Sequence, residues 1–169
     1  MNARRQQGSN IKWLPLSSAS VQSSVVTKVI QMHGTCVARD GAGVLLLGPP
    51  GAGKSDLALR LLARGFELVA DDQVRIEDGA ASAPAPLAGL LEVRGLGILR
   101  LPHLRSAYLA LAVELDEEPE RLPQPRRHEV LDVPLIRVRA DGASAPERIA
   151  CGLDCARGRA GQVAGAFAP

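Results

Sequence analysis

The residues that most constrain the architecture are Val44-Leu45-Leu46-Leu47-Gly48-Pro49-Pro50-Gly51-Ala52-Gly53-Lys54-Ser55. Residues 48–55 match the pattern Gly-x-x-x-x-Gly-Lys-Ser, a loop that binds phosphate groups. The aliphatic run 44–47 before it predicts a strand buried on both faces. Residues 55–63 after it carry apolar side chains at the spacing of one helix face, and Gly65 ends that helix. Because such a loop works between a strand and a helix, the sequence predicts an α/β fold built around this junction.

The chemistry of the loop explains its residue types. Glycines let successive backbone N–H groups turn into one concavity, and the helix N-terminus adds partial positive charge there. Lys54 is expected to bridge the β- and γ-phosphates of a nucleotide, and the Ser55 hydroxyl to reach Mg²⁺. The sequence has no Asn-Lys-x-Asp motif for reading guanine, which argues against a GTPase switch. The expected nucleotide-binding residues are Gly48, Pro49, Pro50, Gly51, Ala52, Gly53, Lys54 and Ser55.

The composition of the chain limits its class. Its 169 residues leave room for one domain, and its few aromatic residues, Trp13, Phe66, Tyr108 and Phe167, predict an aliphatic core. A formal net charge of +2 is too small to indicate nucleic-acid binding by bulk electrostatics. No segment has the roughly 20 apolar residues that cross a membrane. Three cysteines without disulfide-framework spacing favour a reducing, cytoplasmic compartment.

The chain divides into segments of different character. Residues 1–24 contain many serines and no acidic residue, and are interpreted as a disordered tail. Residues 25–160 are interpreted as the P-loop catalytic domain, and 161–169 as a frayed end. The stretch 116–127 mixes acids, arginines and prolines, which predicts a mobile loop.

The remaining pattern predicts a mixed sheet with few helices. Residues 78–86 are rich in Gly, Ala, Ser and Pro and predict a loop, whereas 146–157 predict a closing helix. Cys151 and Cys155 share one face of that helix and are interpreted as structural thiols. Strands are expected over 25–32, 35–39, 44–47, 66–70, 74–77, 90–99, 108–115, 129–133 and 135–139.

Two adjacent carboxylates, Asp71 and Asp72, follow the strand expected over 66–70. That strand could lie beside the phosphate-loop strand and bring both carboxylates near the γ-phosphate. Since neighbouring strand residues point to opposite faces, we expect different roles for the two. One would neighbour the metal, and the other would accept a proton from an attacking hydroxyl. A solvated acidic turn is the alternative interpretation.

His33 is a further candidate. A hairpin turn between Arg39 and Gly43 would place His33 opposite Pro49, at the rim of the phosphate loop. An imidazole there could donate a hydrogen bond to phosphate or tune the pKa of an acid. A purely structural histidine is the alternative.

The run Glu92-Val93-Arg94-Gly95-Leu96-Gly97 is unusual in composition. In an extended chain Glu92 and Arg94 share one face, a pair suited to metal and phosphate oxygens. The two glycines indicate a close backbone approach or a turn. The alternative is a surface ion pair beside a turn.

In this order, these segments resemble the HPr kinase/phosphorylase family. The resemblance covers about residues 25–157, corresponding to the family's catalytic domain, and it implies a sheet similar to that of phosphoenolpyruvate carboxykinases. The last matching segment is the most specific to the family, because phosphate loops occur in many enzymes. The matching segments are His33-Gly34, 48–55, Leu68-Val69-Ala70-Asp71-Asp72 and Leu91-Glu92-Val93-Arg94-Gly95-Leu96-Gly97-Ile98.

The resemblance implies an ATP- and Mg²⁺-dependent kinase that phosphorylates a serine of the small phosphocarrier protein HPr in a phosphotransferase system. Many members also run the reverse phosphorolysis, and members are homo-oligomers. Asp72 resembles the family's base, and His33 its active-site histidine. The resemblance implies His33, Lys54, Asp72 and Arg121 as catalytic residues and Ser55 and Glu92 as magnesium ligands. The residue pattern itself adds Arg94 as a catalytic residue beside the transferring group and Asp71 as a residue of the metal site.

The sequence departs from the family pattern in two places. The N-terminal regulatory domain is expected to be missing, as in short proteobacterial forms that often serve a nitrogen-related phosphotransfer system. The late Pro-Val-x-Pro-Gly-Arg motif is not recognisable, and residues 138–144 stand near its place. Kinase activity is therefore a firmer expectation than phosphorolysis. A P-loop small-molecule kinase and a non-catalytic ATP-sensing adaptor remain as alternatives, and neither a nucleic-acid nor a membrane partner is expected.

Overall fold

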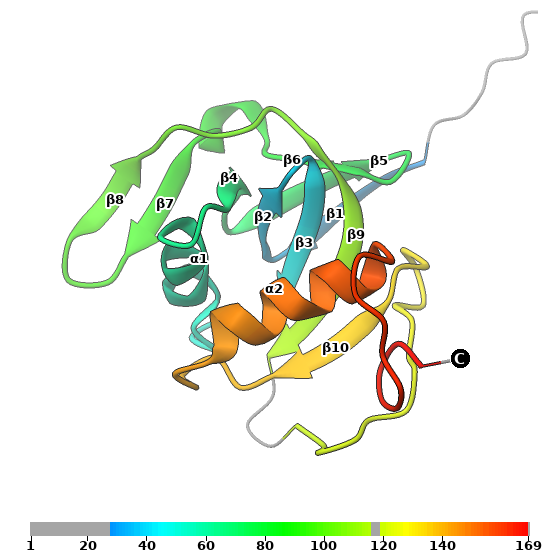
Figure 1. The fold of residues 1–169 in the computed structure, drawn as a ribbon. Coiled ribbons are helices and arrows are strands. Elements are labelled where there is room, and N and C mark those ends of the chain that lie inside the picture. The colour runs from blue at the N-terminus through cyan, green and yellow to red at the C-terminus, as the bar shows by residue number, and fades with distance from the viewer. Residues whose placement is uncertain (1–27, 116–118, 169) are drawn as a thin grey trace, which may run out of the picture.

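The computed structural model describes residues 28–115 and 119–168, and β3 (Ala42–Leu47) lies at its centre (Figure 1). This strand leads into the glycine-rich loop. It pairs antiparallel with β2 (Thr35–Arg39) and parallel with β9 (Ala107–Leu115). Its residues Val44 and Leu45 point to opposite faces and both are fully buried. The strand is therefore covered on both sides, as its continuous aliphatic run predicts.

Around this centre the described residues form a mixed, eight-stranded sheet. The remaining strands are β1 (Val29–His33), β4 (Glu67–Ala70), β5 (Gln73–Glu77), β6 (Ala80–Ser82), β7 (Leu90–Val93), β8 (Gly97–Arg100) and β10 (Leu135–Val138). The sheet order is β1-β5-β6-β9-β3-β2-β4, with β10 parallel to the far part of β9. β7 and β8 form a separate antiparallel hairpin that projects from the body (Figure 1).

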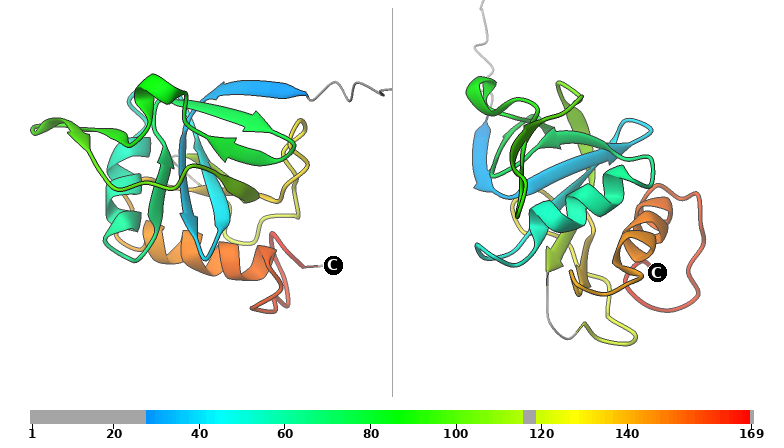
Figure 2. Two further views of the ribbon diagram at one scale, coloured as in Figure 1. Left: turned by 90° about the horizontal axis from the view of Figure 1, so that it is seen from above. Right: turned by 90° about the vertical axis from the view of Figure 1, so that its left-hand side faces the viewer.

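The α-helices of the described chain pack on the same face of the sheet (Figures 1 and 2). They are α1 (Lys54–Leu62) and α2 (Ala145–Ala156). Leu61 of α1 and Ile149 of α2 are fully buried in one cluster with Val44 of β3. None of the helices in residues 28–115 and 119–168 is long and apolar enough to cross a membrane.

The opposite face of β3 contributes Leu45 to a second buried cluster, together with Val69 of β4 and Ile76 of β5. β5 contacts β2, and β6 contacts β4, although these pairs are not neighbours in the sheet order. The sheet therefore curls over itself and encloses this cluster without a helix. Both clusters are built mainly from aliphatic side chains, as the low aromatic content predicts. Phe66 is buried in the first cluster, and the partly buried Phe167 packs against it.

The predicted helices and most predicted strands are confirmed, but three segments differ from the prediction. Residues 78–86 were expected to be a loop, yet Asp78 and Gly79, with φ of 49° and 81°, form a tight turn that joins β5 to β6. An Asp-Gly pair, in which both residues adopt positive φ, is typical of a hairpin turn. The sequence analysis overlooked this pair because the surrounding residues have the composition of a loop. The range 90–99 is likewise a hairpin rather than one extended segment, because the chain turns at Gly95, with φ of 86°.

The strand expected over 129–133 is wrong. His128 N donates to Val133 O, and Asp132 N donates to His128 O, each at 2.9 Å. Asp132 has a φ of 50°, which no strand allows. The segment 129–133 therefore forms a compact turn, although its β-branched residues favour a strand.

Two pairing predictions also differ from the structure. The β2–β3 turn is Asp40-Gly41, so Arg39 pairs with Ala42, and His33 belongs to β1, where it pairs with Gln73 instead of Pro49. β4 pairs with β2 and not with β3, so one strand separates the β4–β5 turn from the phosphate-loop strand. The predicted tail 1–24 and residues 116–118 of the predicted mobile loop lie outside the described residues, and the proposed domain boundaries stay a prediction.

Candidate active site

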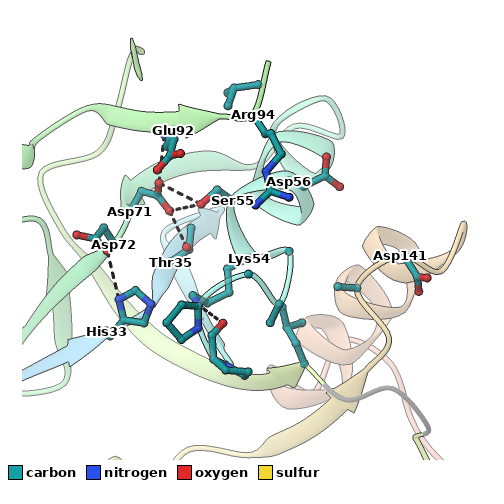
Figure 3. Close-up of a pocket in the computed structure, with 18 of the residues that line it drawn as sticks. His33, Thr35, Lys54, Ser55, Asp56, Asp71, Asp72, Glu92, Arg94 and Asp141 are labelled. Carbon is teal, nitrogen blue, oxygen red and sulfur yellow. Dashed lines mark hydrogen bonds and ion pairs between the residues drawn. The ribbon is translucent and has the colours of Figure 1, made fainter. Parts of the chain in front are cut away.

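A cavity of about 1080 Å³ lies over the N-terminus of α1 (Figure 3). The glycine-rich loop forms one wall. The others come from the ends of β1 and β2, the β4–β5 turn, the end of β7 and the segment after β10. The lining includes all predicted site residues except two: Gly48, whose carbonyl oxygen accepts a hydrogen bond from Lys54, and Arg121, which lies exposed elsewhere. The tertiary fold thus brings together residues that are up to about a hundred positions apart in the sequence.

The glycine-rich loop has the backbone that its residue types predict. Gly51 and Gly53 have φ of 83° and 87°, a region that favours glycine. A Cβ on Gly53 would also lie only 3.3 Å from the Cβ of Ala140. Lys54 is buried, and its Nζ donates to the carbonyl oxygens of Gly48 and Pro49 at 2.9 Å each. Burial lowers the pKa of Lys54, opposed by the nearby Asp71 and Asp72 carboxylates.

Asp71 is the most connected side chain of the cavity (Figure 3). It is 6% exposed, and its Oδ1 accepts hydrogen bonds from Thr35 Oγ1 at 2.7 Å and Ser55 Oγ at 2.9 Å. Its Oδ2 accepts from the backbone N–H of Glu92 at 3.3 Å. These bonds link four separate elements around one carboxylate: β2, α1, the β4–β5 turn and β7.

Asp72 has a different environment, as the sequence predicts for the second carboxylate. Its side chain is 64% exposed, and Oδ1 lies 3.2 Å from Nδ1 of His33. A φ of 68° turns its backbone out of the strand. Gly34 N donates to Asp72 O at 3.2 Å, which ties the ends of β1 and β4 together. The register prediction for His33 was wrong, yet β1 brings the imidazole to the cavity from another direction.

Glu92 and Arg94 both line the cavity from the β7 end. Glu92 is the exposed member of β7, and Arg94 stands in the following turn and reaches toward the first turn of α1 (Figure 3). Arg121, in contrast, is exposed and does not line the cavity. The structure therefore does not bring Arg121 to the other predicted site residues.

The lining contains residues that the sequence analysis did not single out for the site. Thr35 was assigned only to a strand, and its burial gives no signal in the sequence. Arg139 and Asp141, which form an ion pair at 2.6 Å, enter from the segment after β10. The sequence offered one signal for Arg139 and Asp141: they lie near the place of the family motif that is not recognisable in this chain.

The donor chemistry of the site fits Mg²⁺. The Asp71 and Glu92 carboxylates and the Ser55 hydroxyl supply oxygen ligands, which this hard cation prefers. Among the described residues, no group of three or more His, Cys, Asp or Glu side chains is gathered closely enough to hold a metal alone. Sparse protein ligands suit Mg²⁺, which usually keeps water and substrate phosphates in its coordination shell.

The fold and the cavity define a class of protein. It is a mixed α/β protein with a glycine-rich, lysine-containing loop at a helix N-terminus and several carboxylates in the same cavity, among them the adjacent pair Asp71 and Asp72. Comparison with known proteins gives the family: residues 24–117, more than half of the chain, match the model of the HPr Serine kinase C-terminal domain. The chain belongs to this family, which confirms the resemblance seen in its motifs.

Two curated relatives show how much of the family's length is present. A protein named HPr kinase/phosphorylase from Aromatoleum aromaticum is 40% identical over 134 residues, 68% of this chain and 43% of the relative. A protein of the same name from Clostridium novyi is 41% identical over 108 residues, 55% of this chain and 35% of the relative. The chain therefore spans less than half the length of these relatives.

A solved structure supports the fold. The Hpr(Ser) kinase/phosphatase from Coxiella burnetii matches with a TM-score of 0.65 and 26% sequence identity. The match covers 77% of this chain and 92% of that one. This likeness confirms the prediction of a mixed sheet with few helices.

Proposed function

We propose that this protein is an ATP- and Mg²⁺-dependent serine kinase that phosphorylates an HPr-type phosphocarrier of a phosphotransferase system. The observation that carries the proposal is the position of Asp72. Its exposed carboxylate lines the same cavity as Lys54 and Ser55, so a phosphate-binding loop and a candidate base face one space. Membership of the HPr Serine kinase family supports the choice of acceptor.

In the proposed reaction the acceptor serine enters beside Asp72. The serine oxygen attacks the γ-phosphorus, the bond from that phosphorus to the β,γ-bridging oxygen breaks, and ADP leaves. The Asp72 carboxylate takes the serine proton, while His33, whose Nδ1 lies 3.2 Å from Asp72 Oδ1, orients it. Mg²⁺ would neutralise phosphate charge, held by Ser55, Asp71 and Glu92.

Lys54 would bind the β- and γ-phosphates together with the backbone N–H groups of the loop. To do so it must exchange the carbonyl oxygens of Gly48 and Pro49 for phosphate oxygens. Burial lowers the pKa of Lys54, and the nearby Asp71 and Asp72 carboxylates oppose that shift. Arg94 would stabilise the transferring group from the β7 side.

The reverse phosphorolysis and a homo-oligomeric assembly are parts of the proposal that rest on family membership alone. A cytoplasmic location is also part of the proposal and is supported by the cysteine pattern of the sequence. Arg121 takes no step in the proposed reaction, since it does not line the cavity.

The test is incubation of the purified protein with Mg-ATP and an HPr protein, followed by mass spectrometry of HPr. Phosphoserine on HPr is the expected result, and it should vanish when the acceptor serine is replaced by alanine. A folded protein that yields no phosphoserine rules the proposal out. ADP release with a metabolite in place of HPr would then indicate a small-molecule kinase, and ATP binding without any ADP would indicate an adaptor.

A further inference from the structure

Among the described residues, the buried polar and charged side chains all lie around one cavity. Those buried polar or charged side chains are Thr35, Lys54 and Asp71, and each lines the active-site cavity. A buried polar group costs free energy unless it is hydrogen-bonded, so such a group near a site needs a reason. Lys54 and Asp71 have proposed roles toward nucleotide and metal. Thr35, with no exposed surface, does not yet have one.

The backbone fixes Thr35 against Asp71. Cys36 of β2 pairs with Ala70 of β4, and Gly34 N donates to Asp72 O at 3.2 Å. These two contacts flank Thr35 on either side along the chain. Its hydroxyl consequently meets the Asp71 carboxylate, and Oγ1 donates to Oδ1 at 2.7 Å.

The donors to Asp71 differ in what else they must do. Ser55 Oγ donates to Oδ1 and Oδ2 at 2.9 and 3.2 Å, but it is also the loop hydroxyl that a nucleotide-bound cation would engage. The N–H of Glu92 donates at the longer distance of 3.3 Å. Thr35 donates at the shortest distance and is the one fully buried donor of the three.

We propose that Thr35 is a positioning residue that holds Asp71 in place when the Ser55 hydroxyl is engaged by a divalent cation. This inference rests on the proposed Mg-ATP site but not on the identity of the phosphate acceptor. Groups that orient metal ligands in this way commonly change metal affinity by 10- to 100-fold when they are removed.

The experiment measures Mn²⁺ binding by electron paramagnetic resonance, with a non-hydrolysable ATP analogue and no acceptor protein. Thr35→Val keeps the shape and removes the hydroxyl, whereas Thr35→Ser keeps the hydroxyl. We expect Thr35→Val to weaken Mn²⁺ binding by about 10-fold or more, and Thr35→Ser to restore it to near the wild-type value. Affinity for the analogue in EDTA should stay the same in all three proteins.

Several results would overturn the inference. They are wild-type Mn²⁺ affinity in Thr35→Val, an equal loss in both variants, which would indicate packing, or no Mn²⁺ binding by the wild type. Should Thr35→Val not fold, Thr35→Ala makes the same comparison, since it also lacks the hydroxyl. Failure of the proposed function would look different: the Mn²⁺ difference would persist while HPr stays unphosphorylated.

Discussion

Two adjacent residues in a turn can have different environments and therefore different chemical roles. Asp71 is nearly buried and accepts hydrogen bonds from two hydroxyls and one backbone N–H. Asp72 is mostly exposed, because its left-handed backbone turns the side chain away from those donors and toward His33. Aspartate tolerates this conformation better than most residues. A buried carboxylate held by several hydrogen bonds suits a fixed metal ligand, and an exposed one suits accepting a proton from a visiting hydroxyl.

The first prediction separates these two roles. Asp72→Asn should reduce phosphoryl transfer to HPr by roughly 10²- to 10⁴-fold, since it removes the proton acceptor. Nucleotide affinity, measured by calorimetry, should change by less than about twofold, because Lys54, Ser55 and Asp71 remain to hold the phosphates and metal. Initial rates of phosphoserine formation provide the test.

Asp132→Asn is the matched control for that substitution. Asp132 is also exposed and has a φ of 50°, but it lies outside the cavity. Its variant should transfer phosphate at the wild-type rate. Unchanged turnover in Asp72→Asn would remove Asp72 as the base.

A second prediction concerns Cys36, whose pKa burial raises to about 12. The folded state thus favours the neutral thiol, whereas an unfolded thiol titrates near pH 8.5. Its contribution to stability is complete below pH 8.5 and is lost as the pH rises toward 12. Relative to Cys36→Ala, the wild type should lose free energy of unfolding by about 1.4 kcal/mol for each pH unit above 8.5. Urea unfolding between pH 7.5 and 10.5 measures this slope.

The exposed Cys151 provides the comparison for Cys36. Cys151→Ala should retain the wild-type alkaline slope, because its thiol already faces solvent in the folded protein. Equal slopes for wild type and Cys36→Ala would contradict the assigned burial effect.

Among strands and helices, the elements with a strong local signal were predictable. The aliphatic run 44–47, the loop motif and the apolar spacing of 55–63 each depend on neighbouring residues, and β3 and α1 formed where expected. The pairing of β4 with β2 and the turn at 129–133 were not predictable in this way. They depend on contacts between distant segments, and composition and periodicity carry no information about such contacts.

The residues of the candidate site divide in the same way, into those with a local sequence signal and those without one. Lys54, Ser55 and Asp72 were found because motif and order place them together. Thr35 was missed because its role comes from a hydrogen bond to a residue 36 positions away. Arg121 was selected only through the family resemblance, and the cavity does not include it.

A third prediction concerns the contact of α1 with the segment after β10. Arg60 donates to the carbonyl oxygens of Ala140 and Gly142 at 2.6 Å each, and so holds the segment that brings Arg139 to the cavity. Arg60→Met should lower the free energy of unfolding by about 2 kcal/mol, the usual range for hydrogen bonds to a charged group. Hydrogen exchange of the Gly142 amide, which donates to Arg139 O, should also accelerate.

Arg64→Met tests whether loss of a positive charge near the end of α1 is enough to cause these effects. Arg64 lies one turn further along and forms an exposed ion pair with Glu147. Exposed pairs contribute about 1 kcal/mol or less, so stability should fall only slightly. Exchange at Gly142 should stay slow in Arg64→Met. Equal effects in both variants would mean that the hydrogen bonds of Arg60 do not specifically stabilise this segment.

Across the whole molecule, the cavity lies where several independent parts of the sheet meet. Its walls come from both ends of the strand order, β1 and β4, and from the projecting β7–β8 hairpin. The helix that carries Lys54 packs into the main buried cluster. A ligand that contacts all of these walls stabilises the complete fold over any partly opened form, so its binding free energy should be seen in global unfolding.

The fourth prediction follows from that coupling. A non-hydrolysable ATP analogue with Mg²⁺, at about 100 times its dissociation constant, should stabilise the protein by about 2.7 kcal/mol and raise Tm by roughly 5–10 °C. Lys54→Met keeps the aliphatic length of a buried side chain but loses the charge that binds phosphate, so its Tm should hardly respond. Arg148→Met removes one positive charge from an exposed position of α2, outside the cavity, and should keep the full shift. Calorimetric melting of the three proteins makes the comparison. A full shift in Lys54→Met would mean that the nucleotide binds elsewhere than at the glycine-rich loop.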